Sequence, residues 1–138
     1  MIVLLDTNIC IYIMRQKPIA VLQRFSQYTV GEIGVSSITV GELFVGAEKS
    51  QQPAQNHYAV EQFLLPLTIA HFDYDAAVVY GQVRASLEQQ GTQIGALDTL
   101  IAAQALSLDV TLVTNNVREF SRVVGLSVEN WITSPSQP

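Results

Sequence analysis

The chain opens with four large apolar residues at positions 2–5, which lead directly into Asp6, Thr7 and Asn8. Four such residues are too few for a helix and are typical of a strand buried on both faces. A second apolar stretch, at positions 9–14, has the length of a helix. In open α/β sheets, ligands bind just beyond the carboxyl ends of the strands, so Asp6 is a candidate functional residue. The alternative is that Asp6 or Thr7 only caps the helix that follows.

Segments with the pattern of strands alternate with segments of helical pattern along the rest of the chain. Apolar residues spaced at i, i+3, i+4 and i+7 indicate helices, as at Val40, Leu43, Phe44 and Ala47. We predict strands at 2–5, 33–36, 67–71, 110–113 and from 128, and helices at 7–15, from 18, from 37, 54–65, 73–91, 97–108 and 117–123. This alternation predicts an α/β fold of three layers, α/β/α, with a central parallel sheet of four to five strands.

Two of the predicted helices have distinctive sequence features. Asp73 is placed to cap one helix and Gly91 to close it. The helix predicted at 97–108 has its apolar face at Leu97, Leu100, Ile101 and Leu108.

The composition is that of a well-cored globular protein, with 49% apolar and 14% charged residues among 138. We expect a single domain at residues 1–132 and a disordered tail at 133–138. The longest apolar run is far short of the roughly 20 residues that cross a bilayer, and no signal peptide is recognisable. The only cysteine, Cys10, cannot form an internal disulfide, which favours a cytoplasmic location.

The charge distribution limits how the protein could bind nucleic acid. The net charge is −5, and the seven basic residues are scattered along the chain without a cluster. Proteins that bind nucleic acid regardless of its sequence usually carry a basic patch, so this class is disfavoured. An acidic site can still meet a phosphate group through divalent cations.

Four acids follow predicted strands and are candidates for such a site. Asp6 ends the first strand, Glu42 lies in the helix after the second, Asp98 opens a helix, and Glu119 lies beyond the fourth strand. The carboxyl ends of parallel strands share one edge of a sheet, so these residues can converge. Clustered carboxylates repel each other unless a cation neutralises them, and oxygen ligands alone favour Mg²⁺ or Mn²⁺.

Each acid also has a structural explanation. Thr39 and Glu42 have the spacing of a capping box. Asp98 would be stabilised near any helix N-terminus by the helix dipole. Glu119 lies among arginines and could be an ordinary surface acid. The two histidines lack the spacing of a metal or catalytic motif and are better explained as structural.

Four stretches of sequence, in this order and at this spacing, resemble one known family. They cover nearly the whole chain, from Ile2 to about Trp131. The chain resembles a PIN-domain ribonuclease, specifically a VapC-type toxin of a bacterial toxin–antitoxin pair. The matching stretches are 5–8 (Leu-Asp-Thr-Asn), 36–43 with 46–50, 94–98 with 100–103, and 114–116 with 118–120.

The resemblance implies a PIN-like fold and a metal-dependent endoribonuclease that uses Mg²⁺, with Mn²⁺ as a substitute. By motif position, Asp6, Glu42 and Asp98 correspond to the family's acidic metal site. Family members often have Asp where this chain has Asn116. Glu119 is the nearest acid that could take its place as a fourth catalytic residue.

The resemblance also implies supporting residues and partners. Thr7, Asn8 and Thr114 would orient the acids, and Asn115 or Asn116 would bind water held by the metal. The family forms homodimers and is inhibited by a small VapB-type antitoxin, often by a segment threaded into the acidic groove. The RNA substrate implied is tRNA, including the anticodon loop of initiator tRNA, with inhibition of translation as the result.

Three alternatives to the ribonuclease remain at this point. A PIN-fold interaction domain with weak or no catalytic activity is suggested by Asn116 and by the low basic content. A phosphoacceptor domain would need a lysine after a late strand, and no lysine follows Lys49. A phosphatase that uses two aspartates would need Asp at position 8, which is Asn8 here.

Overall fold

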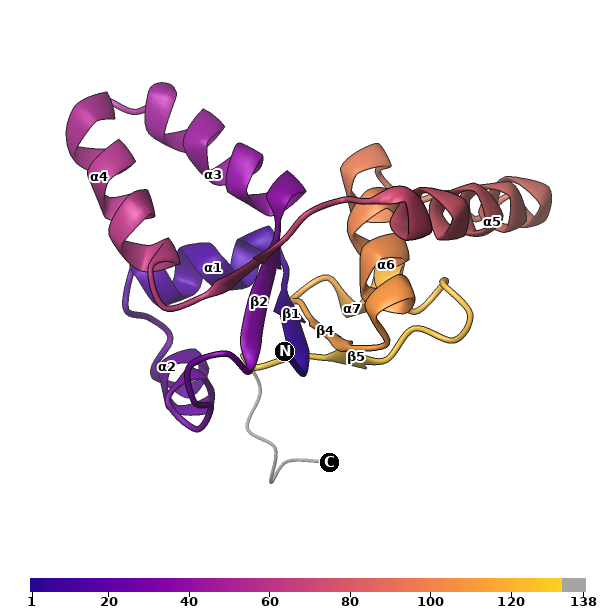
Figure 1. Cartoon of the computed structure of the whole chain (residues 1–138), viewed down its shortest axis with the longest axis horizontal. Coiled ribbons are helices and arrows are strands. Elements are labelled where there is room, and N and C mark those ends of the chain that lie inside the picture. Colours follow the sequence, from indigo (N-terminus) through magenta and orange to yellow (C-terminus); the bar gives the residue numbers. More distant parts are fainter. Residues whose placement is uncertain (133–138) are drawn as a thin grey trace.

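The computed structural model describes residues 1–132, and within them seven helices alternate with five strands (Figure 1). The division into one domain at 1–132 and a tail stays a prediction, and the tail at 133–138 lies outside the described residues. In chain order the elements are β1 (Val3–Leu5), α1 (Thr7–Met14), α2 (Ile19–Phe25), β2 (Ile33–Ser36), α3 (Ser37–Glu48), α4 (Pro53–Leu64), β3 (Thr68–Ala70), α5 (Tyr74–Gln90), α6 (Ala96–Leu108), β4 (Thr111–Val113), α7 (Val117–Phe120) and β5 (Val128–Glu129).

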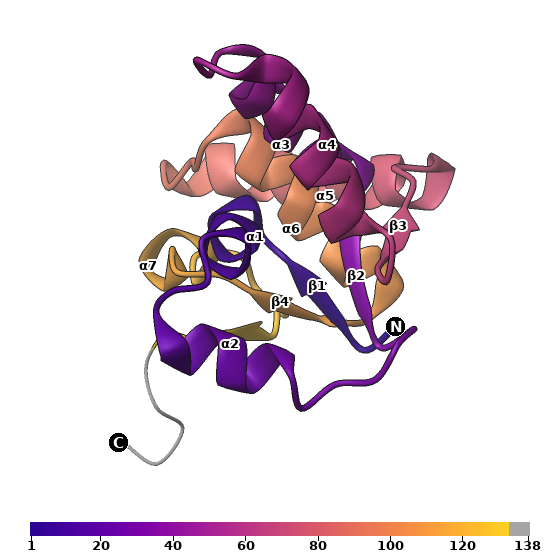
Figure 2. The same cartoon turned by 90° about the vertical axis from the view of Figure 1, so that its left-hand side faces the viewer.

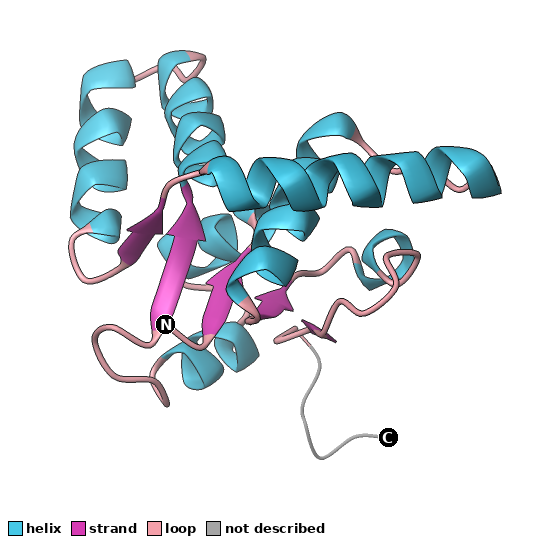
Figure 3. Ribbon diagram, turned by 45° about the vertical axis from the view of Figure 1, so that its right-hand side comes forward, coloured by secondary structure: helices cyan, strands magenta, loops and turns pink. Residues whose placement is uncertain are grey.

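The five strands form one sheet in the order β3-β2-β1-β4-β5, and every pairing is parallel (Figure 3). This confirms the predicted α/β/α fold with a parallel sheet. The central strand β1 pairs with β2 and β4, so that Leu5 lies beside Val35 and Val113. One residue further along, the same register brings Asp6 next to Thr114.

Alternate residues of the strands serve two separate cores, one on each face of the sheet. Val3 and Leu5 pack into a cluster with side chains of α1 to α4, whereas Leu4 packs with side chains of α5 to α7. Because successive side chains of a strand point to opposite faces, β1 is buried on both sides. Figure 2 shows α2 against one side of the sheet and α5 with α6 on the other.

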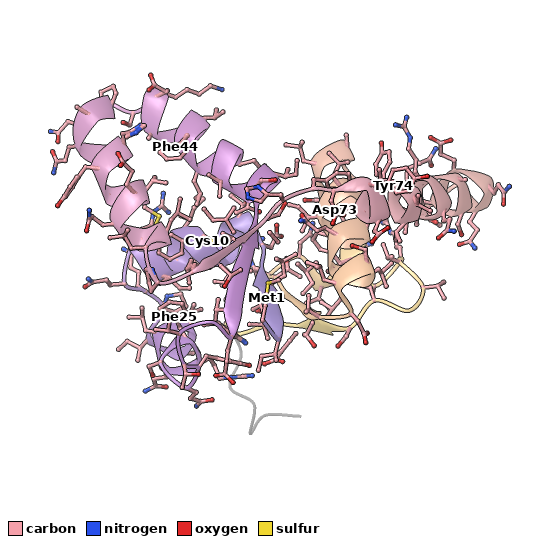
Figure 4. All side chains as sticks on the ribbon, in the orientation of Figure 1. Met1, Cys10, Phe25, Phe44, Asp73 and Tyr74 are labelled. Carbon is pink, nitrogen blue, oxygen red and sulfur yellow. The ribbon has the colours of Figure 1, made fainter. Side chains whose placement is uncertain are left out.

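Local capping fixes the ends of α5 as the sequence predicted. The Oδ1 atom of Asp73 accepts a hydrogen bond of 2.9 Å from the backbone of Ala76, and Figure 4 shows Asp73 and Tyr74 at the start of the helix. Gly91 ends the helix with φ of 67°, a left-handed conformation that glycine adopts without strain.

The predicted apolar face of α6 is wrong for two of its four leucine and isoleucine positions. Leu97 is 45% exposed and Leu108 is 38% exposed. The buried face instead carries Thr99, Ile101, Gln104 and three alanines. Small side chains let α6 approach the sheet and α5 closely, which moves the buried stripe away from the larger residues at the ends of the helix. The predicted helix at 117–123 is also shorter, because α7 ends at Phe120.

Cys10 lies on α1 with its side chain fully buried (Figure 4). Burial, with the nearby charge of Asp6, raises the pKa of its thiol, so the thiol stays protonated and packs as a small apolar group. Within residues 1–132, no helix has the length and apolar character needed to cross a membrane.

Candidate functional site

Asp6 follows β1 directly and is 4% exposed. Its Oδ1 atom accepts a hydrogen bond of 2.8 Å from the backbone of Thr7, and its Oδ2 atom accepts one of 2.7 Å from the hydroxyl of Thr114. Burial raises the pKa of Asp6, these two hydrogen bonds lower it, and the charge of Glu42 raises it further. Asp6 is also the N-cap residue of α1, whereas Thr7 is already helical. The carboxylate of Asp6 therefore caps α1 and also belongs to the acidic site.

Glu42 does not belong to a capping box, so that explanation of its spacing is wrong. The N-cap of α3 is Ser36, whose Oγ atom accepts a hydrogen bond of 3.0 Å from the backbone of Ile38. Glu42 lies beyond the first turn, and its Oε1 atom accepts a hydrogen bond of 2.6 Å from the hydroxyl of Thr7. Glu42 is thus hydrogen-bonded to α1, next to Asp6, and not to the N-terminus of its own helix.

Asp98 lies in the first turn of α6, after the N-cap Gly95, where the helix dipole favours a carboxylate. Its pKa is nevertheless raised to about 6. Burial is the main cause, followed by the negative charges of Asp6, Glu119 and Glu42, and a hydrogen bond from the side chain of Asn116 acts in the opposite direction. The other three predicted acids therefore all lie close enough to Asp98 for their charges to act on it.

Glu119 lies in the first turn of α7 and is partly buried. Neighbouring arginines do not neutralise it, because no ion pair of Glu119 is found among residues 1–132. Arg122 instead donates a hydrogen bond of 3.0 Å to the backbone carbonyl of Gln93. Glu119 lies near Asp98, and this position disfavours the explanation of Glu119 as an ordinary surface acid.

The predicted supporting residues meet in the loop after β4. The backbone of Asn115 donates a hydrogen bond of 3.2 Å to Oδ1 of Asn8. The backbone of Asn116 donates one of 3.0 Å to Oγ1 of Thr114, the same hydroxyl that binds Asp6. The loop is thereby fixed against α1 and against the end of β1.

Two further residues of this region were not predicted from the sequence. The side chain of Asn115 donates a hydrogen bond of 3.3 Å to the hydroxyl of Tyr12, and the fully buried Thr39 lies 3.3 Å from Thr7 through their hydroxyl oxygens. The sequence contained one signal for each of them. Tyr12 lies one helical turn after Asn8, and Thr39 lies one turn before Glu42.

Within residues 1–132, neither histidine takes part in these contacts. The Nε2 atom of His57 lies 3.0 Å from Oε1 of Glu61, one turn along α4, and its ring packs against Phe44 at 4.6 Å between centroids. His71 is exposed just after β3. Neither histidine contributes a ligand to the acidic site.

The donor set of the site consists of oxygen atoms. Among residues 1–132, no three histidine, cysteine, aspartate or glutamate side chains are arranged as a group that could hold a metal ion. The four acids approach each other closely enough to shift the pKa of Asp98, but they do not surround a common point.

A groove begins beside the site. It is enclosed by α1, α3 and α4, and Glu42 stands among its lining residues with Ile11, Met14, Leu43 and Val60. Arg15, Ser50 and Asn56 also line the groove, so most of its lining is apolar but it carries one basic side chain besides the acidic Glu42.

Comparisons with known proteins agree with this geometry. The PIN domain family matches residues 3–126. Ribonuclease VapC2 of Haemophilus influenzae is 47% identical over 129 residues, which cover 94% of this chain and 97% of the relative. The tRNA(fMet)-specific endonuclease VapC of Shigella flexneri is 44% identical over 128 residues, covering 93% and 96%. The crystal structure of DNA-bound VapBC from Salmonella typhimurium contains a chain that superposes with a TM-score of 0.90 at 41% identity, covering 95% of this chain and 98% of that one. The chain therefore belongs to the PIN-domain family and, within it, to the VapC ribonucleases of toxin–antitoxin systems.

Proposed function

We propose that this chain is a metal-dependent endoribonuclease that cleaves tRNA and thereby inhibits translation, as the toxin of a VapBC-type pair. The observation that carries this proposal is the convergence of Asp6, Glu42, Asp98 and Glu119 from β1, α3, α6 and α7, with the pKa of Asp98 raised to about 6. Mutually repelling, partly buried carboxylates destabilise a fold, and such an arrangement is typical of a site that binds cations.

The residues fit a divalent cation by their chemistry. Hard cations such as Mg²⁺ and Mn²⁺ prefer oxygen ligands, and Asp6, Glu42 and Asp98 would hold one, with Glu119 as a fourth acid. Burial is the main cause of the raised pKa of Asp98, and a bound cation would offset the repulsion from the neighbouring acids that adds to it. Since these carboxylates do not enclose a common point, binding would require them to draw together.

The cation would supply Lewis-acid chemistry, since it lowers the pKa of water, polarises a phosphodiester and offsets charge on the leaving 3′-oxygen. The side chains of this chain have complementary tasks. Thr114 and the backbone of Thr7 hold the two oxygens of Asp6, and the hydroxyl of Thr7 holds Glu42. Asn116 donates to Asp98 and partly offsets the charge that its neighbours impose. These contacts orient the acids before any ligand arrives.

Two relatives with tRNA in their names support tRNA as the substrate, namely the tRNA(fMet)-specific endonucleases of Shigella flexneri and Salmonella typhimurium, at 44% and 43% identity. The weak basic content of this chain also favours a substrate that is bound by its shape, at a site where cations bridge carboxylates and phosphates. Initiator tRNA, cut in the anticodon loop, is the specific substrate we propose.

A VapB-type antitoxin is the proposed protein partner. Solved structures of similar chains are VapBC complexes, among them those of Salmonella typhimurium and Rickettsia felis. The apolar groove beside Glu42 could accept an apolar segment with a basic side chain at its end. We also propose a homodimer, because Tyr74 and Val78 leave apolar surface exposed on α5.

The decisive experiment is cleavage of purified initiator tRNA by the purified chain with Mg²⁺, with Mn²⁺ and with excess chelator. We expect cleavage only with a cation, and none with Asp6→Asn. Asp75→Asn, which changes an exposed acid on α5, is the matched control and should cleave normally. Cleavage in chelator, or by Asp6→Asn, would rule out the metal site. A wild-type chain that binds Mn²⁺ but cleaves no RNA would favour the inactive interaction domain.

A further inference from the structure

Thr39 is a fully buried residue whose hydroxyl group has no role in its own helix. It lies in the first turn of α3 and is 0% exposed, and the cap of that helix is provided by Ser36. A buried hydroxyl costs free energy unless it has a hydrogen-bond partner. Valine has nearly the shape of threonine and would fill the same space without this cost. The hydroxyl of Thr39 must therefore be explained by what it contacts.

Its contact is the hydroxyl of Thr7, on a different helix. Thr7 Oγ1 lies 3.3 Å from Thr39 Oγ1 and 2.6 Å from Glu42 Oε1, and no other hydrogen bond of the Thr39 hydroxyl is found in the part of the chain that the structure describes. The hydroxyl of Thr7 has a single proton. The shorter distance makes Glu42 its main acceptor, and Thr39 is the second acceptor within reach.

Both acceptors approach Thr7 from one face of α3, because Thr39 and Glu42 are three residues apart. If Glu42 turns away, the hydroxyl of Thr7 can still donate its proton to Thr39. In this rotamer, Thr7 therefore keeps one of its two hydrogen-bond acceptors. Other rotamers of Thr7 would lose both.

We propose that Thr39 is a positioning residue for Glu42, acting through Thr7 as the second acceptor of its hydroxyl proton. In this way Thr7 keeps one rotamer whether Glu42 accepts its proton or is drawn toward a cation. The functional consequence rests on the proposed cation site. The positioning itself is a property of the metal-free chain.

The metal-free part is tested by NMR on the χ1 angle of Thr7, from three-bond couplings of its methyl carbon. We expect one rotamer in the wild type and in Thr39→Ser, which keeps the hydroxyl, and averaged couplings in Thr39→Val, which removes it. Thr68→Val, at an exposed strand position, should leave the couplings unchanged. If Thr39→Val failed to fold, Thr39→Ala would supply the comparison. A single Thr7 rotamer in a folded variant without the hydroxyl would overturn the proposal.

The consequence for the site is tested by calorimetry with Mn²⁺ alone. We expect Thr39→Val to weaken Mn²⁺ binding about three- to tenfold, the effect of losing one hydrogen bond, and Thr39→Ser to restore it. In a Thr7→Val background the same substitution at Thr39 should have no effect. Equal Mn²⁺ affinity of wild type and Thr39→Val would overturn the proposal. A wild type that binds no Mn²⁺ would refute the cation site instead, and the NMR result would then decide the role of Thr39 by itself.

Discussion

The hydroxyl of Thr114 donates a hydrogen bond of 2.7 Å to Oδ2 of Asp6, although 108 residues separate the two along the chain. The two residues follow β4 and β1, which pair in parallel, so the register of the sheet sets this contact. The same hydroxyl accepts a hydrogen bond from the backbone N–H of Asn116. One side chain thus holds a buried carboxylate and the loop that leads toward Glu119.

Replacing Thr114 with Val should therefore destabilise the ionised form of Asp6. The hydrogen bond lowers the pKa of Asp6, so its loss raises that pKa further. We expect the free energy of unfolding to fall by about 1–3 kcal/mol at pH 7. Below the ordinary pKa of Asp, the carboxyl is protonated in both states, and the loss should shrink. Urea unfolding at pH 7 and pH 3 measures both values, with Thr114→Ser as the control. Equal losses at the two pH values would mean that Thr114 acts through packing and through its hydrogen bond with Asn116, not through the charge of Asp6.

Asp98→Asn should stabilise the metal-free chain at neutral pH. The pKa of Asp98 is raised to about 6, so the folded state binds a proton more tightly than the unfolded state does. Such a group contributes stability below its unfolded pKa and loses it as the pH rises through about 6. With the half-exposed position discounted for solvent screening, we expect a gain on the order of 1 kcal/mol at pH 7.

Thermal unfolding in chelator between pH 4 and pH 8 tests this expectation. The melting curves of wild type and Asp98→Asn should diverge as the pH rises through 6. Glu88→Gln, which changes an exposed acid paired with Arg84 on α5, should show no such divergence. A variant that is less stable than wild type at pH 7 would contradict the raised pKa.

Asn116→Asp tests which residue completes the acidic site. The change removes the hydrogen bond from Asn116 to Asp98 and adds a fifth carboxylate. The metal-free chain should lose on the order of 1 kcal/mol of stability through like-charge repulsion. Its affinity for Mn²⁺ should rise roughly three- to tenfold, since cation sites are tuned by the number of charged ligands.

Glu119→Gln should act in the opposite direction, with weaker Mn²⁺ binding and a lower pKa of Asp98. Calorimetry with Mn²⁺ on both variants gives the comparison. If Glu119→Gln left Mn²⁺ binding unchanged while Asn116→Asp strengthened it, Glu119 would have no part in the site.

Trp131→Ala should be severely destabilising without affecting the acids. Trp131 is fully buried, its ring stacks on Tyr28 at 5.4 Å, and its indole N–H donates a hydrogen bond of 3.0 Å to Glu129, which also pairs with Arg24. Removing a buried Trp side chain costs about 3–5 kcal/mol. Urea unfolding should show a loss of this size for Trp131→Ala and a smaller one for Trp131→Phe. Mn²⁺ binding by the folded fraction should be unchanged, and a loss of binding would show that the segment after β5 supports the site.

The sequence determined the elements of this fold because their signals are local. Apolar periodicity marks each strand and helix, and a cap such as Asp73 or a glycine such as Gly91 acts within a few residues of its own position. The four candidate acids were also recognisable, since each follows a strand or opens a helix. The order of these elements then restricted the fold to a parallel α/β/α arrangement.

The family resemblance already named Thr7 and Thr114 as residues that orient the acids, but only the tertiary structure decided which acid each one holds. The strand order places β1 between β2 and β4, and this order brings Thr114 to Asp6 and α3 to Thr7. Thr39 and Glu42 had the spacing of a local capping box, yet the hydroxyl of Thr39 contacts Thr7 on another helix. Leu97 had the pattern of a core residue, yet it is exposed because α6 packs through its alanines. Contacts between residues distant in sequence depend on how the elements pack, and packing is not encoded in any single stretch of the chain.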